Sequence, residues 1–154
     1  MGILNVTPDS FYKESRSNNK NLNKIDYGLA NILDIGFESS RPGSIPLSKL
    51  KEINRLSKFL SKYQDFHRNL SIDTYKHEVA DFALKNGFKI INDIRGGGEK
   101  GQMFEVALKH NAQIVIMHMK GDPLNMQKQP FYKDVINELL NFFDKKLIWL
   151  RRLA

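Results

Sequence analysis

The 154-residue chain contains no cysteine, which excludes disulfide bonds and thiolate metal sites. Long hydrophobic runs are also missing, since no stretch approaches the roughly 20 apolar residues of a membrane-spanning helix. The first residues have the pattern of a core strand, without the basic start and small-residue cleavage site of a secretory leader. We therefore expect a cytoplasmic protein that does not associate with a membrane.

Concentrated positive charge is lacking too, although the net charge is +7. Lysine and arginine are spread over the chain, no basic run alternates with aromatic residues, and helix-turn-helix or zinc-finger spacings are absent from the sequence. These charges are typical of a solvated surface. A nucleic-acid-binding module is therefore disfavoured, whereas the overall positive field would favour a small polyanionic substrate.

Short apolar strands alternate regularly with amphipathic helices. Strands are expected to begin near residues 1, 31, 69, 89 and 113, and helices to span residues 48–63, 74–87, 102–110 and 134–152, with a short one near 22–29. This order predicts an α/β fold with a parallel sheet and right-handed crossovers. Two architectures satisfy it. One is the front of a (β/α)8 barrel, whose eight units would fill roughly 250 residues, and the other is an open doubly wound sheet.

Helical spacing predicts the buried faces, with Thr74 as an N-cap and Gly87 as a helix terminator. The expected buried side chains are Leu50, Ile53, Leu56 and Leu60, then Val79, Phe82 and Ala83, then Val135, Leu139, Phe142, Phe143 and Leu150.

Each predicted strand ends in a polar cluster, and the carboxyl ends of barrel strands are where ligand-binding groups gather. The clusters are residues 1–11 (MGILNVTPDSF), 34–43 (DIGFESSRPG), 71–80 (SIDTYKHEVA), 90–98 (IINDIRGGG) and 117–127 (MHMKGDPLNMQ). In this order they resemble the successive motifs of the dihydropteroate synthase family. The resemblance implies a TIM-type (β/α)8 barrel, of which about five β/α units are present, and a single pterin-binding domain over residues 1–154, truncated at its C-terminus.

The family joins 6-hydroxymethyl-7,8-dihydropterin pyrophosphate to p-aminobenzoate in folate biosynthesis, giving 7,8-dihydropteroate and pyrophosphate. The resemblance implies that Asp73 and Asn92 bind the polar edge of the pterin and that Ile94 and Met117 pack on its ring. From the residues alone, Asp73 fits equally well as a carboxylate at the N-terminus of a helix. Asn92 fits a turn residue, and Met117 fits an ordinary side chain of the hydrophobic core.

The leaving pyrophosphate requires positive charge and a hard cation. The resemblance implies that Asn5 binds Mg²⁺ and pyrophosphate through its amide oxygen, that Arg41 grips a phosphate or the aminobenzoate carboxylate, and that Ser40 adds a hydroxyl. We assign catalytic roles to Asn5, Asp73 and Arg41. An arginine before Pro-Gly also fits an ordinary surface loop.

The first polar loop resembles the family's mobile loop, which closes over the substrates and excludes water. Its substrate-binding residues would be Thr7, Pro8, Asp9 and Phe11. Phe11 could instead be a plain loop anchor. His118 has no second histidine at ligand spacing, so we predict a structural hydrogen-bonding role for it and not a catalytic one.

The sequence departs from the family pattern in a short segment after Phe11 and at Phe37, where a small residue is usual. The bulky ring of Phe37 could crowd the end of the second strand or be accommodated by local repacking. Three later family motifs do not occur in residues 1–154: Asp-Pro-Gly-x-Gly-Phe, a pterin-binding lysine, and Arg-x-His. Two alternatives to the synthase stay open, a pterin-binding methyltetrahydrofolate methyltransferase and a non-catalytic pterin-binding remnant. The family also implies a homodimer for a full-length chain.

Overall fold

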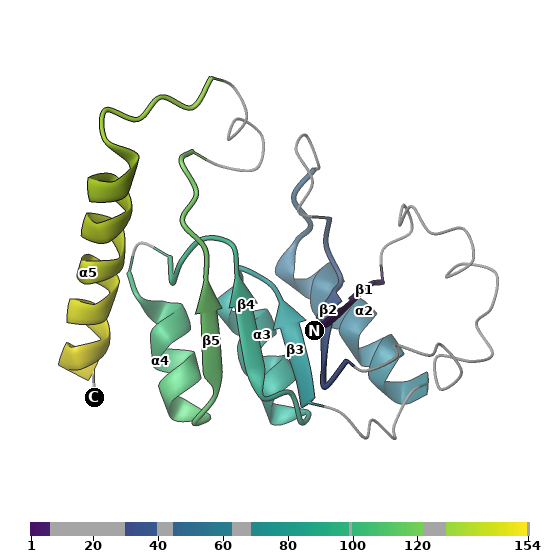
Figure 1. Ribbon diagram of the computed structural model, residues 1–154. Helices are drawn as coiled ribbons and strands as arrows, with labels where there is room; N and C mark the ends of the chain where they lie inside the picture. Colours follow the sequence, from purple (N-terminus) through teal and green to yellow (C-terminus); the bar gives the residue numbers. More distant parts are fainter. Residues whose placement is uncertain (7–29, 40–44, 63–68, 99, 122–128, 154) are drawn as a thin grey trace.

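The computed structural model describes residues 1–6, 30–39, 45–62, 69–98, 100–121 and 129–153 (Figure 1). The expected short helix near residues 22–29 lies outside these ranges. The elements, in chain order, are β1 (Gly2–Asn5), β2 (Ile32–Gly36), α2 (Lys49–Lys62), β3 (Asn69–Asp73), α3 (His77–Lys85), β4 (Ile90–Asp93), α4 (Gln102–Lys109), β5 (Gln113–Ile116) and α5 (Val135–Leu153). The alternating pattern predicted from the sequence is confirmed.

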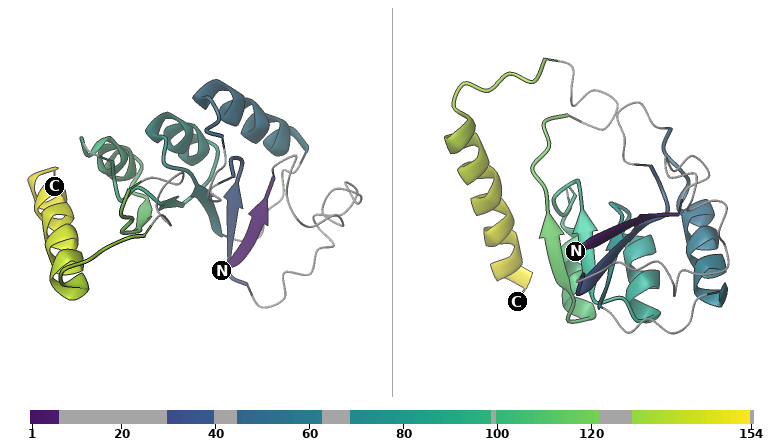
Figure 2. Two further views of the ribbon diagram at one scale, coloured as in Figure 1. Left: turned by 90° about the horizontal axis from the view of Figure 1, so that it is seen from above. Right: turned by 45° about the vertical axis from the view of Figure 1, so that its right-hand side comes forward.

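The five strands form one parallel sheet in the order β1-β2-β3-β4-β5. Helices α2, α3 and α4 lie side by side along one face of this curved sheet (Figure 2). A doubly wound domain would reverse its strand order and place helices on both faces. Consecutive strand order with helices on one side is instead the arrangement of a TIM-type barrel. The described sheet has β1 and β5 as its two edges, so the barrel is incomplete here.

The hydrophobic core fills the space between the sheet and these helices. Alternate side chains of each strand point to this face because successive residues of a strand face opposite ways. From the strands it takes Leu4, Leu33, Ile35, Leu70, Ile72 and Ile91, and from the helices Leu56, Phe59, Ala80, Ala83, Leu84, Met103, Val106 and Ala107. The opposite face of the sheet is therefore free for polar side chains.

Helix α2 buries Leu56 as predicted and packs Leu60 partly buried against the core, but one predicted residue, Leu50, faces solvent. Leu50 is 68% exposed, whereas Glu52, Leu56 and Phe59 are buried at i, i+4 and i+7. The prediction for Leu50 is wrong because Glu52 makes two polar contacts with the turn after β3, one buried and one partly buried, and these fix the rotation of the helix.

The prediction of Thr74 as an N-cap is also wrong. Helix α3 begins at His77, its N-cap residue is Lys76, and no side chain caps it. The hydroxyl of Thr74 donates instead to Glu52 Oε1 at 2.8 Å. At the other end the prediction holds: Gly87 has a positive φ of 97°, which a residue without a Cβ adopts without strain. The predicted buried face of α3 is confirmed at Val79 and Ala83, with Phe82 partly buried.

Helix α5 buries less than predicted. None of its residues is fully buried, Val135 and Phe143 are exposed, and Leu139, Phe142 and Leu150 are only partly covered. The aromatic side chains of Phe142 and Trp149 approach the β4–α4 loop at Gly96 and Gly101. Within the described part of the chain, nothing covers the remaining apolar side of this helix. No helix among the described residues is long and apolar enough to cross a membrane.

The polypeptide of residues 1–154 alone is expected to be poorly soluble or only partly folded. Unpaired sheet edges promote pairing between chains, and the exposed side chains of Ile3, Val115, Ile136 and Leu140 add apolar surface. Size-exclusion chromatography and thermal unfolding monitored by near-UV circular dichroism measure this directly. A monodisperse sample with a cooperative transition would contradict the prediction.

Candidate functional site

A row of four residues crosses the carboxyl ends of four neighbouring strands. In the register of the sheet Asn5 lies beside Gly36, Gly36 beside Asp73, and Asp73 beside Asn92. All four face away from the helices, because Leu4, Ile35, Ile72 and Ile91, their neighbours in sequence, belong to the core. The structure thus brings together three of the residues that the sequence predicts for substrate or metal binding.

Gly36 leaves room for two oxygen atoms beside the backbone of β2. A Cβ at this position would lie 3.2 Å from Asp73 Oδ2 and 3.3 Å from Asn5 Oδ1. Both distances are shorter than ordinary van der Waals contact, so any larger residue would force these side chains to move. An amide oxygen and a carboxylate oxygen are thereby held on either side of a bare stretch of backbone.

Asp73 has an unusual affinity for protons. Burial, followed by the negative charges of Asp34 and Glu52, raises the pKa of its carboxyl group to about 7. The group therefore changes charge near neutral pH, where perturbed carboxyl groups are often functional. Asp73 is not the capping residue of α3, since that role falls to Lys76, directly before the first residue of the helix, His77.

Asn92 lies within β4 and not in a turn, so the turn interpretation of this residue is wrong. Its Nδ2 donates to Oδ2 of Asp34 on β2 at 2.9 Å. This bond leaves the amide oxygen of Asn92 as the available acceptor. An acceptor beside the carboxyl group of Asp73 suits a ligand that presents several N–H groups along one edge.

Sequence reasoning missed Asp34 as a site residue. Its side chain is buried, and its Oδ1 has no hydrogen-bond partner among the described residues. The hydroxyl of Ser71, its register neighbour on β3, is likewise buried without a partner there. The signal was available, because Asp34 lies two residues before Gly36 and must face the same side of the sheet.

The two residues predicted to contact the faces of a ring lie after the next strand ends. Ile94 is partly buried in the turn after β4, and Met117 follows β5 with its side chain 41% exposed. The interpretation of Met117 as an ordinary core side chain is therefore wrong. The neighbouring His118 packs edge-to-face on Phe142, with ring centroids 4.9 Å apart. This is a ring-packing contact, and the predicted hydrogen-bonding role of His118 stays a prediction.

Six predicted site residues lie outside the described ranges: Thr7, Pro8, Asp9, Phe11, Ser40 and Arg41.

The donor chemistry at Asn5 is compatible with magnesium. Among the described residues, no three His, Cys, Asp or Glu side chains gather into a group that could hold a metal ion. Magnesium, however, commonly keeps several water ligands and joins substrate phosphates to only one or two protein oxygen atoms. Asn5, an exposed residue at the end of β1, would offer one such oxygen through its side-chain amide.

Comparisons with known proteins agree with the geometry. The family model described as pterin binding enzyme matches residues 1–153. The dihydropteroate synthase of Escherichia coli K12 is 39% identical over 153 residues, which are 96% of this chain and 54% of that protein. The chain spans about half the length of the curated relatives that it matches.

Two solved structures share the fold. The dihydropteroate synthase of Thermus thermophilus in complex with 4-aminobenzoate superposes with a TM-score of 0.79 at 34% identity, covering 99% of this chain and 56% of that one. The Burkholderia cenocepacia enzyme complexed with 7,8-dihydropteroate also gives a TM-score of 0.79 at 34% identity, covering 100% of this chain and 53% of that one. Both solved chains therefore extend well beyond the part matched here.

Proposed function

Because the chain belongs to the pterin-binding enzyme family, we propose that it forms the pterin- and metal-binding part of a dihydropteroate synthase. The single observation that carries the proposal is the row Asn5–Gly36–Asp73–Asn92 at the carboxyl ends of adjacent strands. In the proposed reaction the amine of p-aminobenzoate forms a bond to the pterin methylene carbon. The bond from that carbon to the pyrophosphate oxygen breaks, and the amine releases one proton.

Pterin recognition is assigned to Asp73 and Asn92, supported by Asp34. As a carboxylate, Asp73 would accept N–H groups of the pterin edge, and the Asn92 amide oxygen, oriented by the bond to Asp34, would accept another. A wrong ligand would leave these partly buried groups unpaired, and this penalty discriminates between ligands. Ile94 and Met117 would pack on the two faces of the ring.

The departing pyrophosphate is assigned to Asn5, Ser40 and Arg41. A bound Mg²⁺ would supply positive charge to the phosphate oxygens as the carbon–oxygen bond breaks. Asn5 would hold the ion through its amide oxygen, and Ser40 would donate a hydroxyl hydrogen bond. The guanidinium of Arg41 offers two parallel donors to a phosphate or to the carboxylate of p-aminobenzoate.

The family resemblance also assigns the first loop to the substrates. Thr7, Pro8, Asp9 and Phe11 would cover the site during turnover and exclude the water that would otherwise attack a cationic pterin. We further propose a cytoplasmic homodimer with no nucleic-acid partner. The methyltransferase alternative is less well supported, because curated relatives at 37% and 39% identity are named dihydropteroate synthases.

The experiment is a coupled assay of pyrophosphate release with p-aminobenzoate, on the protein expressed from its complete reading frame. Arg41→Ala is expected to raise KM for p-aminobenzoate or to lower kcat roughly 100-fold, since a charge-assisted bidentate contact is lost. Its binding of the dihydropterin should change by less than about threefold, because Arg41 is not assigned to the pterin.

The wild-type protein decides between the remaining alternatives in the same assay. Pterin binding without turnover would favour the non-catalytic remnant. A protein that neither binds the pterin nor releases pyrophosphate would overturn the proposal.

A further inference from the structure

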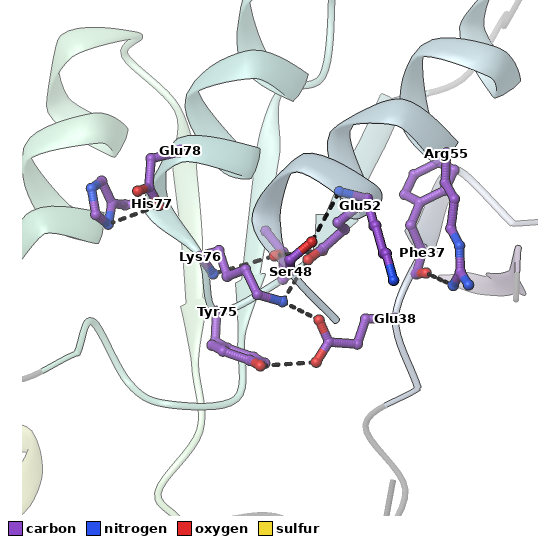
Figure 3. Close-up of polar contacts among 11 residues, drawn as sticks. Phe37, Glu38, Ser48, Glu52, Arg55, Tyr75, Lys76, His77 and Glu78 are labelled. Atoms are coloured by element: carbon purple, nitrogen blue, oxygen red, sulfur yellow. Dashed lines mark hydrogen bonds and ion pairs between the residues drawn. The ribbon is translucent and has the colours of Figure 1, made fainter. Parts of the chain in front are cut away.

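The three residues that follow Asp73 all donate hydrogen bonds to carboxylates of other elements. Thr74 Oγ1 donates to Glu52 Oε1 at 2.8 Å, and the Tyr75 hydroxyl donates to Glu38 Oε1 at 2.8 Å. Lys76 Nζ lies between the two carboxylates, donating to Glu52 Oε2 at 2.7 Å and to Glu38 Oε2 (Figure 3). All four carboxylate oxygens are therefore bound, and we call these five residues the Lys76 clamp.

The clamp is shielded from solvent. The side chains of Lys76, Glu38 and Glu52 are 14%, 11% and 0% exposed. Burial opposes the charged form of Lys76, but its hydrogen bonds to both glutamates outweigh this and raise its pKa. Burial also raises the pKa of Glu52, despite the donors around it. Ion pairs in such surroundings are screened little by salt, and removing one partner leaves a buried charge uncompensated.

The clamp joins the parts of the fold that carry the site. Glu38 lies two residues after Gly36 at the end of β2, and Glu52 belongs to α2. The donors belong to the turn between β3 and α3. The guanidinium of Arg95, in the turn after β4, lies 4.1 Å from the ring centroid of Tyr75, which extends the contacts to the strand that carries Asn92.

Helix formation does not account for the clamp. Thr74 would ordinarily be expected to cap α3, yet that helix has no side-chain cap. Instead, the Thr74 hydroxyl donates to Glu52 and accepts only a longer bond, 3.3 Å, from the backbone N–H of Lys76, so the side-chain donors of the turn are directed at β2 and α2.

We propose that Lys76 is a positioning residue, which fixes the turn after β3 to the end of β2 and so keeps Asp73 in register with Gly36 and Asn92 for pterin binding. This inference rests on the proposed function, since it concerns the pterin site of that enzyme. Lys76 itself would contact no substrate. Its effect passes through the backbone of residues 73–76.

The test is Lys76→Met in the protein expressed from its complete reading frame, with dihydropterin binding measured by isothermal titration calorimetry. A shift of Asp73 out of register would weaken its hydrogen bonds to the pterin, so we expect the Kd to rise about 10- to 100-fold, the cost of one to two buried hydrogen bonds. KM for the pterin substrate should rise in parallel, whereas KM for p-aminobenzoate should stay within about twofold, a selectivity that general loosening of the fold would not give. Lys76→Arg should restore at least part of the affinity because it keeps the charge.

Lys49→Met is the matched control. Lys49 also pairs with a glutamate, Glu78 on α3, at 2.6 Å, but these side chains are 55% and 37% exposed. Exposed pairs contribute little, so the Kd of this variant should stay within about twofold of the wild type. Tyr75→Phe serves if Lys76→Met does not fold, since it removes only one hydroxyl, and an increase in Kd of about 3- to 10-fold is expected from one lost hydrogen bond.

The outcomes separate the two proposals. A wild-type protein that binds no dihydropterin overturns the proposed function, and with it this inference. A wild type that binds, combined with Lys76→Met and Tyr75→Phe variants that bind as the Lys49→Met control does, overturns the positioning role alone. An equal rise in KM for the pterin substrate and for p-aminobenzoate would likewise exclude a role specific to the pterin site.

Discussion

Asp73→Asn is expected to weaken dihydropterin binding at least about 100-fold at alkaline pH, because the amide presents a donor where the carboxylate accepts from the pterin N–H groups. In the wild type, affinity should rise as the pH increases through about 7, the pKa to which burial and the neighbouring Asp34 raise this group. The variant should lose this dependence. Calorimetric titrations at several pH values measure both effects.

The same substitution should increase the stability of the fold at alkaline pH. Since its pKa is raised in the native state, Asp73 contributes stability that is present below the ordinary pKa and is lost as the pH rises through about 7. Above that pH the native protein carries a buried carboxylate that Asn removes. The gain in the free energy of unfolding is expected to be about 2–4 kcal/mol, allowing for partial contact with solvent.

Asp81→Asn is the matched control, with the opposite sign. Hydrogen bonds from Lys85, His110 and Lys109 hold the pKa of Asp81 well below its usual range. Its contribution is therefore present above the ordinary pKa and lost as the pH falls, so Asp81→Asn should lower stability at neutral pH. Asp81 lies on α3, on the helix side of the sheet, and pterin affinity should not change. An Asp73→Asn variant with wild-type affinity would remove Asp73 from the proposed site.

The strands and their order were predictable because apolar runs of this length between helical repeats leave few alternatives. The residues on the side of the sheet that faces away from the helices were predictable in part. Once Gly36 is placed beside Asn5 and Asp73, the alternation of side chains along the strand also puts Asp34 on the side that faces away from the helices. The partner of Asp34 could not be derived, because its contact with Asn92 joins strands that are not neighbours in the sheet.

The wrong predictions for Leu50 and Thr74 share one physical cause. Periodicity treats leucine as buried and glutamate as exposed, yet Glu52 is fully buried because Thr74 and Lys76 neutralise and bind it, and Leu50 is exposed as a result. Tertiary polar contacts of this kind leave no trace in local periodicity. The burial predicted for helix α5 is too high for a different reason: its apolar residues are covered only where described elements face them.

Phe37 shows how position within a strand separates stability from function. The sequence suggested that a bulky residue beside Gly36 could crowd the site. The structure places Phe37 on the opposite side, fully buried and edge-to-face with Phe59 of α2 at 5.5 Å between ring centroids. Its carbonyl oxygen accepts a hydrogen bond from Arg55 Nη1 at 2.7 Å. The departure from the family pattern therefore falls in the core.

Phe37→Ala is accordingly expected to lower the free energy of unfolding by about 3–5 kcal/mol, through lost burial and the cavity left behind. Pterin affinity at a temperature where the variant stays folded should change by less than about threefold, since the oxygen atoms around Gly36 face the other side. Phe131→Ala, which truncates a side chain that is 73% exposed, is the matched control and should alter stability by less than about 0.5 kcal/mol. Denaturant unfolding and calorimetry on all three proteins would separate the two faces of β2. A folded Phe37→Ala variant that bound pterin as weakly as Asp73→Asn would mean that the core behind Gly36 sets the geometry of the site.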